Sequence, residues 1–338
     1  MNMSGYTLED FIVEQPITNA DLLAFAVSHV NLPPELTKKY REHMNSVRER
    51  LEKYIYEHPD YNLVKTLHSG SLRKGTAIRI GGDLDLAIYV KAAAMQGIDN
   101  SGLISWLRDR LQELYPGFAS DQLEEHEHCV TIHYKTPGLK EIDAVPVLYS
   151  DEPDNRGDLV TRDGTRVPTS ISLHIEFIKN RKVRQPEHFA QFVRFAKYWA
   201  KLQKIDYEQR GDHFRFKSLM IELICAHLCD NGLDASDYIE ALRRFFAYIV
   251  KNGLKEPIFF TDYYNRGSIT LSDTEVIQIY DPVNPQNNIA RTYTEAQRQK
   301  IVNEAQKALN AITTASTSTT ETEAVEKWQI ILGTPFRG

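Results

Sequence analysis

The sequence predicts an α+β protein, with a first lobe built around a mixed β-sheet and a second lobe made of helices. Up to residue 150, short runs of alternating or uniformly apolar residues predict strands, with helical patterns between them. From Ser172 on, apolar residues recur at three- and four-residue steps, as in amphipathic helices. We therefore expect a sheet-containing lobe over residues 1–165, a helical lobe over 166–312, and a linker with a tail over 313–338.

One long helix, the spine of the first lobe, is expected over residues 33–58. Its apolar residues, among them Tyr40, Met44 and Leu51, return every three or four positions, and two prolines stand in its first turn. Four strands and a second helix should follow it and complete the mixed sheet. The expected strands cover residues 62–67, 83–90, 129–134 and 140–149, and the second helix covers 101–117.

Helices dominate the second lobe, and several of them end at a glycine or an Asn-Gly stop. Residues 313–324, "TTASTSTTETEA", form a polar stretch without apolar periodicity, which predicts a flexible linker. Apolar residues return in the tail over 325–338. The expected helices cover residues 172–181, 186–204, 214–232, 235–253 and 292–312, with one strand-like segment at 275–282.

Composition is that of a cytoplasmic globular protein. The chain has 338 residues and a formal net charge of −6, so its overall charge does not require nucleic acid as a partner. Its three cysteines, Cys129, Cys225 and Cys229, are too few for a disulfide framework and favour a reducing compartment. No run of the sequence is long and apolar enough to predict a transmembrane helix, so no membrane partner is expected.

Two aspartates lie in a strand that is otherwise apolar, "DLDLAIYV". Residues two apart in a strand point to the same side, so Asp83 and Asp85 share one face. Two neighbouring carboxylates repel each other unless a cation neutralises them, and Mg²⁺ prefers oxygen ligands. Asp143, in the middle of another apolar strand, is the candidate third ligand. A solvated edge strand would also tolerate aspartates, but the residues upstream favour a metal site.

Those upstream residues are Gly70 and Ser71, in "SGSLRKGT", which follows a predicted strand. Gly70 lies 13 residues before Asp83. Glycine lets the backbone approach a phosphate group closely, and the serine hydroxyl adds a donor. Three strand carboxylates beside a phosphate-binding turn predict a site for phosphoryl transfer with two metal ions.

Taken together, "GSLRKGTAIRIGGDLDL" and "EIDAVPVL" resemble the signature of nucleotidyltransferases with the polymerase-β-like fold. The long preceding helix and the helical second lobe are similar to those of the CD-NTases, which are bacterial cyclic oligonucleotide synthases related to cyclic GMP-AMP synthase and oligoadenylate synthetase. The resemblance spans roughly residues 33–312. It implies that Asp83, Asp85 and Asp143 carry catalysis and bind two Mg²⁺ ions, with Mn²⁺ as a possible substitute.

The same resemblance implies further nucleotide-binding residues. "FAKYWAK" resembles the family helix whose lysine grips the donor triphosphate, which corresponds to Lys197. "FKSLMIELI" resembles the next helix, whose serine contacts phosphates, which corresponds to Ser218 with Lys217 beside it. "IQIYDPVNPQNNIA" resembles a segment near the donor nucleotide and brings in Asp281 and Asn287.

The activity that the resemblance implies is synthesis of a cyclic di- or trinucleotide in CBASS-type anti-phage signalling, with ATP as substrate and other NTPs as further candidates. A separate effector would read the product. A template-independent RNA nucleotidyltransferase and a linear oligoadenylate synthetase are alternatives within the same chemistry. An inactive nucleotide-binding scaffold is the alternative of another class. It is disfavoured because all three acidic positions are filled.

The apolar tail ends in "TPFRG" and allows two interpretations. A regulatory protein could bind or modify it, with Gly338 as the handle, as the resemblance implies for some relatives. The tail could equally fold back onto the surface of its own chain.

Overall fold

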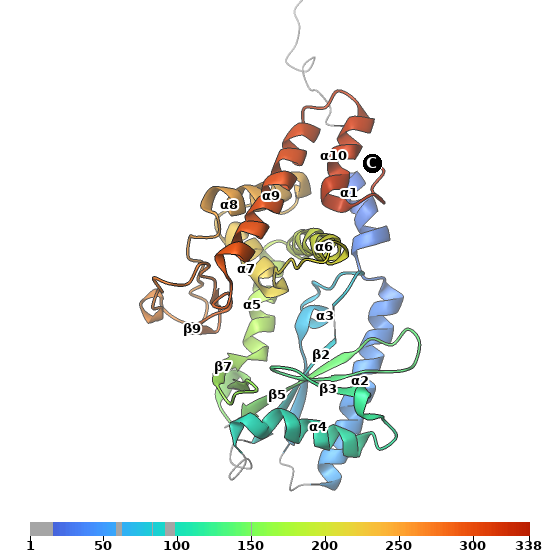
Figure 1. The fold of residues 1–338 in the computed structure, drawn as a ribbon, viewed down its shortest axis with the longest axis vertical. Coiled ribbons are helices and arrows are strands. Elements are labelled where there is room, and N and C mark those ends of the chain that lie inside the picture. Colours follow the sequence, from blue (N-terminus) through green and yellow to red (C-terminus); the bar gives the residue numbers. More distant parts are fainter. Residues whose placement is uncertain (1–15, 59–62, 83, 92–98, 150) are drawn as a thin grey trace, which may run out of the picture.

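The computed structural model describes residues 16–58, 63–82, 84–91, 99–149 and 151–338 (Figure 1). Its lower part holds the sheet with helices α2 and α4, and its upper part is helical. Buried apolar side chains gather in two large clusters, one between the sheet and these two helices and one around α6. The residue boundaries that we assign to the lobes stay a prediction.

The sheet is mixed, as the sequence predicts. Strands β2 and β5 pair in parallel, whereas the other pairs of the sheet are antiparallel. The order is β1-β2-β5-β4-β3, with β6 paired to β5 and β7 to β6. The strands are β1 (Leu63–His68), β2 (Leu84–Lys91), β3 (Leu123–Glu125), β4 (Val130–Ile132), β5 (Ile142–Tyr149), β6 (Arg156–Val160) and β7 (Arg166–Ser170).

Helix α2 (Pro34–Glu57) confirms the predicted spine, and α4 (Leu103–Leu114) packs with it against the sheet. The predicted apolar stripe of α2 is buried at Tyr40, Met44 and Leu51. Alternate residues of β2 divide between the two faces, because Leu84, Leu86, Ile88 and Val90 join the cluster with α2, whereas Ala87 and Tyr89 belong to a small separate cluster. The face that Asp85 shares with Ala87 is therefore turned away from the spine helix.

The helical part surrounds α6, which Figure 1 shows end-on between its neighbours. Eleven of its residues are buried, including Phe192, Phe195 and Trp199. A helix that is apolar on nearly all sides in its first half has to lie in a core. The helices of this part are α1 (Asn19–Phe25), α5 (Ile171–Arg184), α6 (His188–Gln209), α7 (Ser218–Asp230), α8 (Tyr238–Asn252), α9 (Glu295–Ala315) and α10 (Glu321–Leu332), with a two-stranded sheet of β8 (Tyr280–Asp281) and β9 (Asn284–Asn288). The short α3 (Gly70–Lys74) lies below α6, and its Leu72 belongs to the cluster of the sheet.

Two segments differ from the sequence prediction, one at the expected lobe boundary and one at residues 275–282. Residues 151–170, where we placed the boundary, contain the β6–β7 hairpin, which extends the sheet beyond β5. Charged and polar residues in "RGDLV" and "RVPTS" hide its strand character, because the hairpin is only half-buried. The strand predicted at 275–282 shrinks to Tyr280–Asp281.

The flexible linker predicted over residues 313–324 is wrong. Helix α9 continues to Ala315, and α10 begins at Glu321, with the Thr320 side chain accepting a hydrogen bond from the backbone N–H of Glu323. Threonine and serine are poor signals of a helix interior but good caps, which explains the error. Helix α10 is held by burial of Ala324, Trp328, Ile331 and Leu332.

The tail after α10 folds back onto its own chain. Phe336 is only 1% exposed and meets Phe25 of α1 edge-on, with the ring centroids 5.4 Å apart. The Gln329 side chain donates a hydrogen bond of 2.9 Å to the Phe336 carbonyl. The structure therefore agrees with the second interpretation, in which the tail folds back onto its own chain. Gly338 remains exposed at the end of the tail.

No helix in the described part of the chain combines the length and the apolar character that crossing a membrane requires.

We expect Phe336→Ala to lower the free energy of unfolding by about 3 kcal/mol, because it empties a fully buried ring site. Urea denaturation of the full chain measures this. Arg337→Ala, at the exposed next position, is the control and should change stability by no more than about 0.5 kcal/mol. Equal, small effects of both changes would contradict the packed tail.

Candidate active site

The two described carboxylates of the predicted set stand side by side. Asp85 on β2 and Asp143 on β5 are direct partners in the parallel register. Adjacent strands lie about 4.8 Å apart, so both half-buried side chains leave the sheet on the same face at neighbouring points. Thr131 on β4 donates a hydrogen bond of 2.6 Å to Asp143 Oδ1 and fixes that side chain. Asp83 lies outside the described residues.

The negative charge of Asp85 and Asp143 affects the nearby Cys129 thiol. Burial raises the pKa of the Cys129 thiol to about 12, and the carboxylates of Asp143 and Asp85 add to the rise. Such a concentration of negative charge suits a divalent cation, and carboxylate oxygens are the ligands that Mg²⁺ and Mn²⁺ accept. Within the described residues, which do not include Asp83, no three metal-ligating side chains lie close enough together to hold a metal ion.

The predicted phosphate-binding turn lies directly against Asp85, and glycine at position 70 allows this close approach. The N–H of Ser69 donates to the backbone carbonyl of Asp85 over 2.9 Å, which joins the end of β1 to β2. Gly70 then takes a φ of 67°, and a Cβ at this position would lie 1.7 Å from Asp85 Oδ2. Only glycine meets both constraints. The turn therefore places Ser71 next to the aspartate face.

A cavity of about 260 Å³ opens beside this turn, between α3, α6 and α7. It brings together Ser71, Lys197 and Ser218, three of the predicted phosphate-binding residues. Ser218 is exposed at the first position of α7. The lining residues are Ser71, Thr76, Ile78, Ile80, Gly82, Lys197, Ala200, Lys201, Lys204, Phe214, Phe216, Ser218 and Ile221.

Lys197 lines this cavity as part of a buried ionic cluster around Glu222. Lys197 Nζ lies 2.6 Å from Glu222 Oε1 and 3.1 Å from the Thr76 hydroxyl, while Lys74 Nζ lies 2.9 Å from Glu222 Oε2. The Thr76 hydroxyl also donates to Glu222 over 2.7 Å. Burial would raise the pKa of Glu222, but the charges of Lys197 and Lys74 outweigh it and hold the pKa below its usual range. The glutamate is therefore ionised, and two lysines share its one negative charge.

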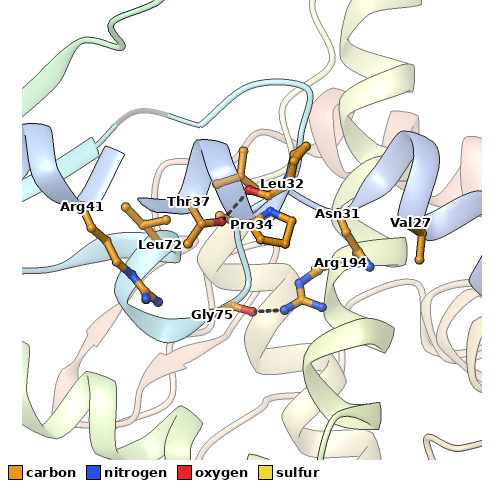
Figure 2. A pocket seen from close by; sticks show the side chains of 11 residues that line it. Val27, Asn31, Leu32, Pro34, Thr37, Arg41, Leu72, Gly75 and Arg194 are labelled. Carbon is orange, nitrogen blue, oxygen red and sulfur yellow. Dashed lines mark hydrogen bonds between the residues drawn. The ribbon is translucent and has the colours of Figure 1, made fainter. Parts of the chain in front are cut away.

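Two further cations tie α3 to the helical part. Figure 2 shows Arg194 of α6 beside Gly75, the residue that follows α3, and its guanidinium donates a hydrogen bond of 2.7 Å to the Gly75 carbonyl. Lys182 of α5 reaches the Lys74 carbonyl over 3.3 Å. The short helix that begins at Gly70 is thus held at its far end by two cations as well as by Glu222.

The remaining predicted site residues do not line this cavity. The Lys217 ammonium donates a hydrogen bond of 2.7 Å to the Ile289 carbonyl. Asp281 is 4% exposed, lies 2.7 Å from His174 Nε2 and accepts a hydrogen bond of 3.2 Å from the Asn287 amide. Burial would raise the pKa of Asp281, but His174 and these hydrogen bonds lower it overall. Asp281 and Asn287 thus hold the β8–β9 hairpin together.

Sequence reasoning missed Thr76, Lys201 and Glu222. Lys201 stands four residues after Lys197, a spacing that puts both on one side of a helix and could have indicated it. Glu222 is likewise four residues after Ser218. Nothing in the sequence around Thr76 indicates that this residue belongs to the site.

Three features define a nucleotidyltransferase of the polymerase-β-like fold. They are the mixed sheet with its paired carboxylates, the glycine-serine turn, and the lysine-lined cavity beside that turn. No family model matches the chain. Among curated proteins, the cyclic AMP-AMP-AMP synthase of Escherichia coli strain MS 115-1 is 44% identical over 324 residues, which is 95% of this chain and 98% of that protein. The CBASS oligonucleotide cyclase CdnC of E. coli strain KTE188 is 27% identical over 328 residues, with 95% and 98% covered.

Solved structures of CdnC from E. coli MS115-1 agree with this. The structure with ATP has a TM-score of 0.86 at 42% identity and covers 96% of this chain and 100% of its own. The complex with a HORMA-deltaN protein has a TM-score of 0.85 at 43% identity, with 95% and 99% covered. This chain belongs to the CD-NTase family, as the signature residues indicated, and it is a nucleotidyltransferase of the cyclic oligonucleotide synthases of anti-phage signalling. Enzymes of this class generally use divalent metal ions.

Gly70→Ala should reduce nucleotidyl transfer by about 100-fold, because the added Cβ pushes the Asp85 carboxylate out of place. Consumption of ATP by the purified variant measures this. Gly117→Ala is the matched control, since Gly117 has no atom within 4 Å of the added Cβ and no positive φ. A Gly70→Ala enzyme as active as the control would show that Asp85 tolerates displacement.

Proposed function

We propose that this enzyme joins ATP into a cyclic trinucleotide of AMP units, as the name of its 44% identical relative states for that protein. Other nucleoside triphosphates, and a cyclic dinucleotide, are the further candidates for substrate and product. The observation that carries the proposal is the alignment of Asp85 with Asp143 beside a turn and a cavity suited to a triphosphate.

In this proposal the donor triphosphate occupies the cavity. The hydroxyls of Ser71 and Ser218 donate hydrogen bonds to phosphate oxygens, and Lys197 supplies positive charge from the cavity wall. Lys217 precedes Ser218 and donates a hydrogen bond to the Ile289 carbonyl. Ile289 directly follows the hairpin that Asp281 and Asn287 stabilise. These three residues then shape the nucleotide site from its outer side.

The acceptor hydroxyl, 2′ or 3′, attacks the α-phosphorus of the donor. The new O–P bond forms as the bond to pyrophosphate breaks, and Asp143, held by Thr131, accepts the proton of the hydroxyl. Two Mg²⁺ ions, replaceable by Mn²⁺, would be held by Asp83, Asp85 and Asp143 and would neutralise phosphate charge. Repeated transfer and a final attack of the free hydroxyl on the 5′-triphosphate close the ring.

We further propose a regulatory protein partner, because a 43% identical relative is solved in complex with a HORMA-deltaN protein. The proposal includes a downstream effector that reads the product, and the cytoplasm as the compartment, which the free cysteines favour. Because α10 and Phe336 belong to the core, a partner would have to reach the exposed terminus around Gly338 or another surface, not the whole tail.

The test is mass spectrometry of the product formed from mixed nucleoside triphosphates and MgCl₂, after phosphatase treatment. We expect a product of three AMP units without terminal phosphates. Asp143→Asn and Asp83→Asn should each lower its formation by about 1,000-fold or more. Asp121→Asn, at an exposed position on the same lobe, is the control and should keep full activity.

Other outcomes identify the rival functions. Phosphatase-sensitive chains of AMP would identify a linear synthetase, and nucleotides added to RNA would identify an RNA nucleotidyltransferase. Binding of ATP without consumption would identify a scaffold. Full activity of Asp143→Asn would refute the assignment of the carboxylates.

A further inference from the structure

A second cavity lies on the other side of α3 from the one proposed for the triphosphate. Its volume is about 360 Å³, and it is bordered by residues 27–34, the start of α2, α3 with the residues after it, and α6 (Figure 2). The two cavities share no lining residue among those that the structure describes. Ser71 and Thr76 line the first, whereas Leu72 and Gly75 line the second. The segment of residues 71–78 is therefore a wall with one cavity on each side.

Positive charge faces the second cavity without a matching negative charge. The described residues that line it include Arg41 and Arg194 but no aspartate or glutamate, and Figure 2 shows the two arginines at opposite ends of the cavity. Arg41 is exposed, whereas the half-buried Arg194 donates hydrogen bonds to the Gly75 carbonyl over 2.7 Å and to Gln191 Oε1 over 3.1 Å. Both acceptors are uncharged. Within the described part of the chain, neither arginine forms an ion pair with a carboxylate.

A third cation lies against the same wall. The half-buried Lys182 ammonium donates a hydrogen bond of 3.3 Å to the Lys74 carbonyl, and a Cβ built on Gly75 would lie 2.9 Å from it. Burial lowers the pKa of Lys182, and the charge of Arg194 lowers this pKa further. Burial also lowers the pKa of Arg194, although a guanidinium remains protonated. An anion in the cavity would offset both the repulsion between these two cations and the cost of burying them.

Most of the remaining lining is apolar, and one polar atom in it lacks a partner. Asn31 Oδ1 is buried and has no hydrogen-bond partner among the described residues. A buried acceptor without a partner is costly, and an N–H or O–H group of a ligand would satisfy it. The cavity volume falls within the range of small-molecule sites, which are mostly apolar with a few polar groups. The apolar lining residues are Val27, Leu32, Pro33, Pro34, Leu72 and Ala77.

We propose that this cavity binds a small organic anion, with a carboxylate, sulfonate or phosphate group at Arg194 and an apolar ring or chain against Leu32 and Pro34. An inorganic anion would leave the apolar lining unfilled. The site is separate from the nucleotide cavity, so such a ligand and ATP bind at the same time. The ligand contacts the wall of residues 71–78 on the side opposite Ser71. The proposal goes beyond the function proposed above and does not depend on which product the enzyme makes.

The probe for the test is 1-anilinonaphthalene-8-sulfonate, an organic anion with an apolar body and an N–H group, titrated into the full chain and followed by fluorescence. Val27 lines the cavity and is 70% exposed, so it offers a matched pair of variants that leaves the core intact. Val27→Glu should weaken probe binding about 10-fold, because a carboxylate then faces the anion, whereas Val27→Gln should change it less than about twofold. Arg194→Gln should also weaken binding about 10-fold, because a charge-assisted contact is lost. Arg210→Gln, at an exposed arginine directly after α6 that does not line the cavity, is the control.

Three further titrations test the class of ligand and the place of binding. N-phenyl-1-naphthylamine has the same rings without the sulfonate, so its affinity should be the same for both Val27 variants. Excess ATP, added with EDTA so that no turnover occurs, should leave the sulfonate probe bound. Inorganic phosphate should not displace the probe, because it lacks the apolar body.

Equal affinity of Val27→Glu and Val27→Gln for the sulfonate probe would overturn the proposal, even if Arg194→Gln proves unstable. Displacement of the probe by ATP would place it in the nucleotide cavity and would also overturn the proposal. Displacement by inorganic phosphate would contradict the organic character of the ligand. A loss of N-phenyl-1-naphthylamine binding in Val27→Glu as large as that of the sulfonate probe would show that charge is not recognised. A wild type that makes no cyclic product would refute the proposed function and leave this inference standing.

Discussion

The ionised Glu222 carboxylate, 2% exposed, is the constraint on which the active-site region depends. It stands on α7 and takes contacts from α6 through Lys197 and from the end of α3 through Lys74 and Thr76. A buried charge without such partners is strongly destabilising, so all three segments must be in place together. One side chain thereby fixes how the phosphate turn sits against the helical part.

The second constraint acts at the other end of α3. The Gly70 backbone lies so close to Asp85 that a single added carbon would overlap the carboxylate. A five-residue helix with glycine contacts at its start and an ionic cluster at its end has little freedom to shift. Preorganisation of this kind matters for phosphoryl transfer, where positioning and charge supply most of the catalysis.

Much of this could be predicted from the sequence where the signal is local. The two-residue spacing of aspartates in an apolar strand, the period of the spine helix and the Gly-Ser turn each follow from neighbouring residues. The burial of Lys197 could not, because its partner Glu222 lies on another helix and looks like an ordinary helical glutamate. Helix α10 could not be predicted either, because its polar first residues resemble a disordered stretch. Only the burial of Trp328 in the folded chain shows that this segment packs as a helix.

The parallel pairing of β2 with β5 has a consequence for how the enzyme acquires activity. Asp85 and Asp143 become neighbours only after the chain has passed through α4, β3 and β4 and returned to the same side of the sheet. Such a long-range crossover is among the slower events in folding, since its loop must close before the contact forms. A nascent or partly folded chain therefore has no assembled pair of carboxylates. Catalytic competence therefore arises only when the sheet is complete.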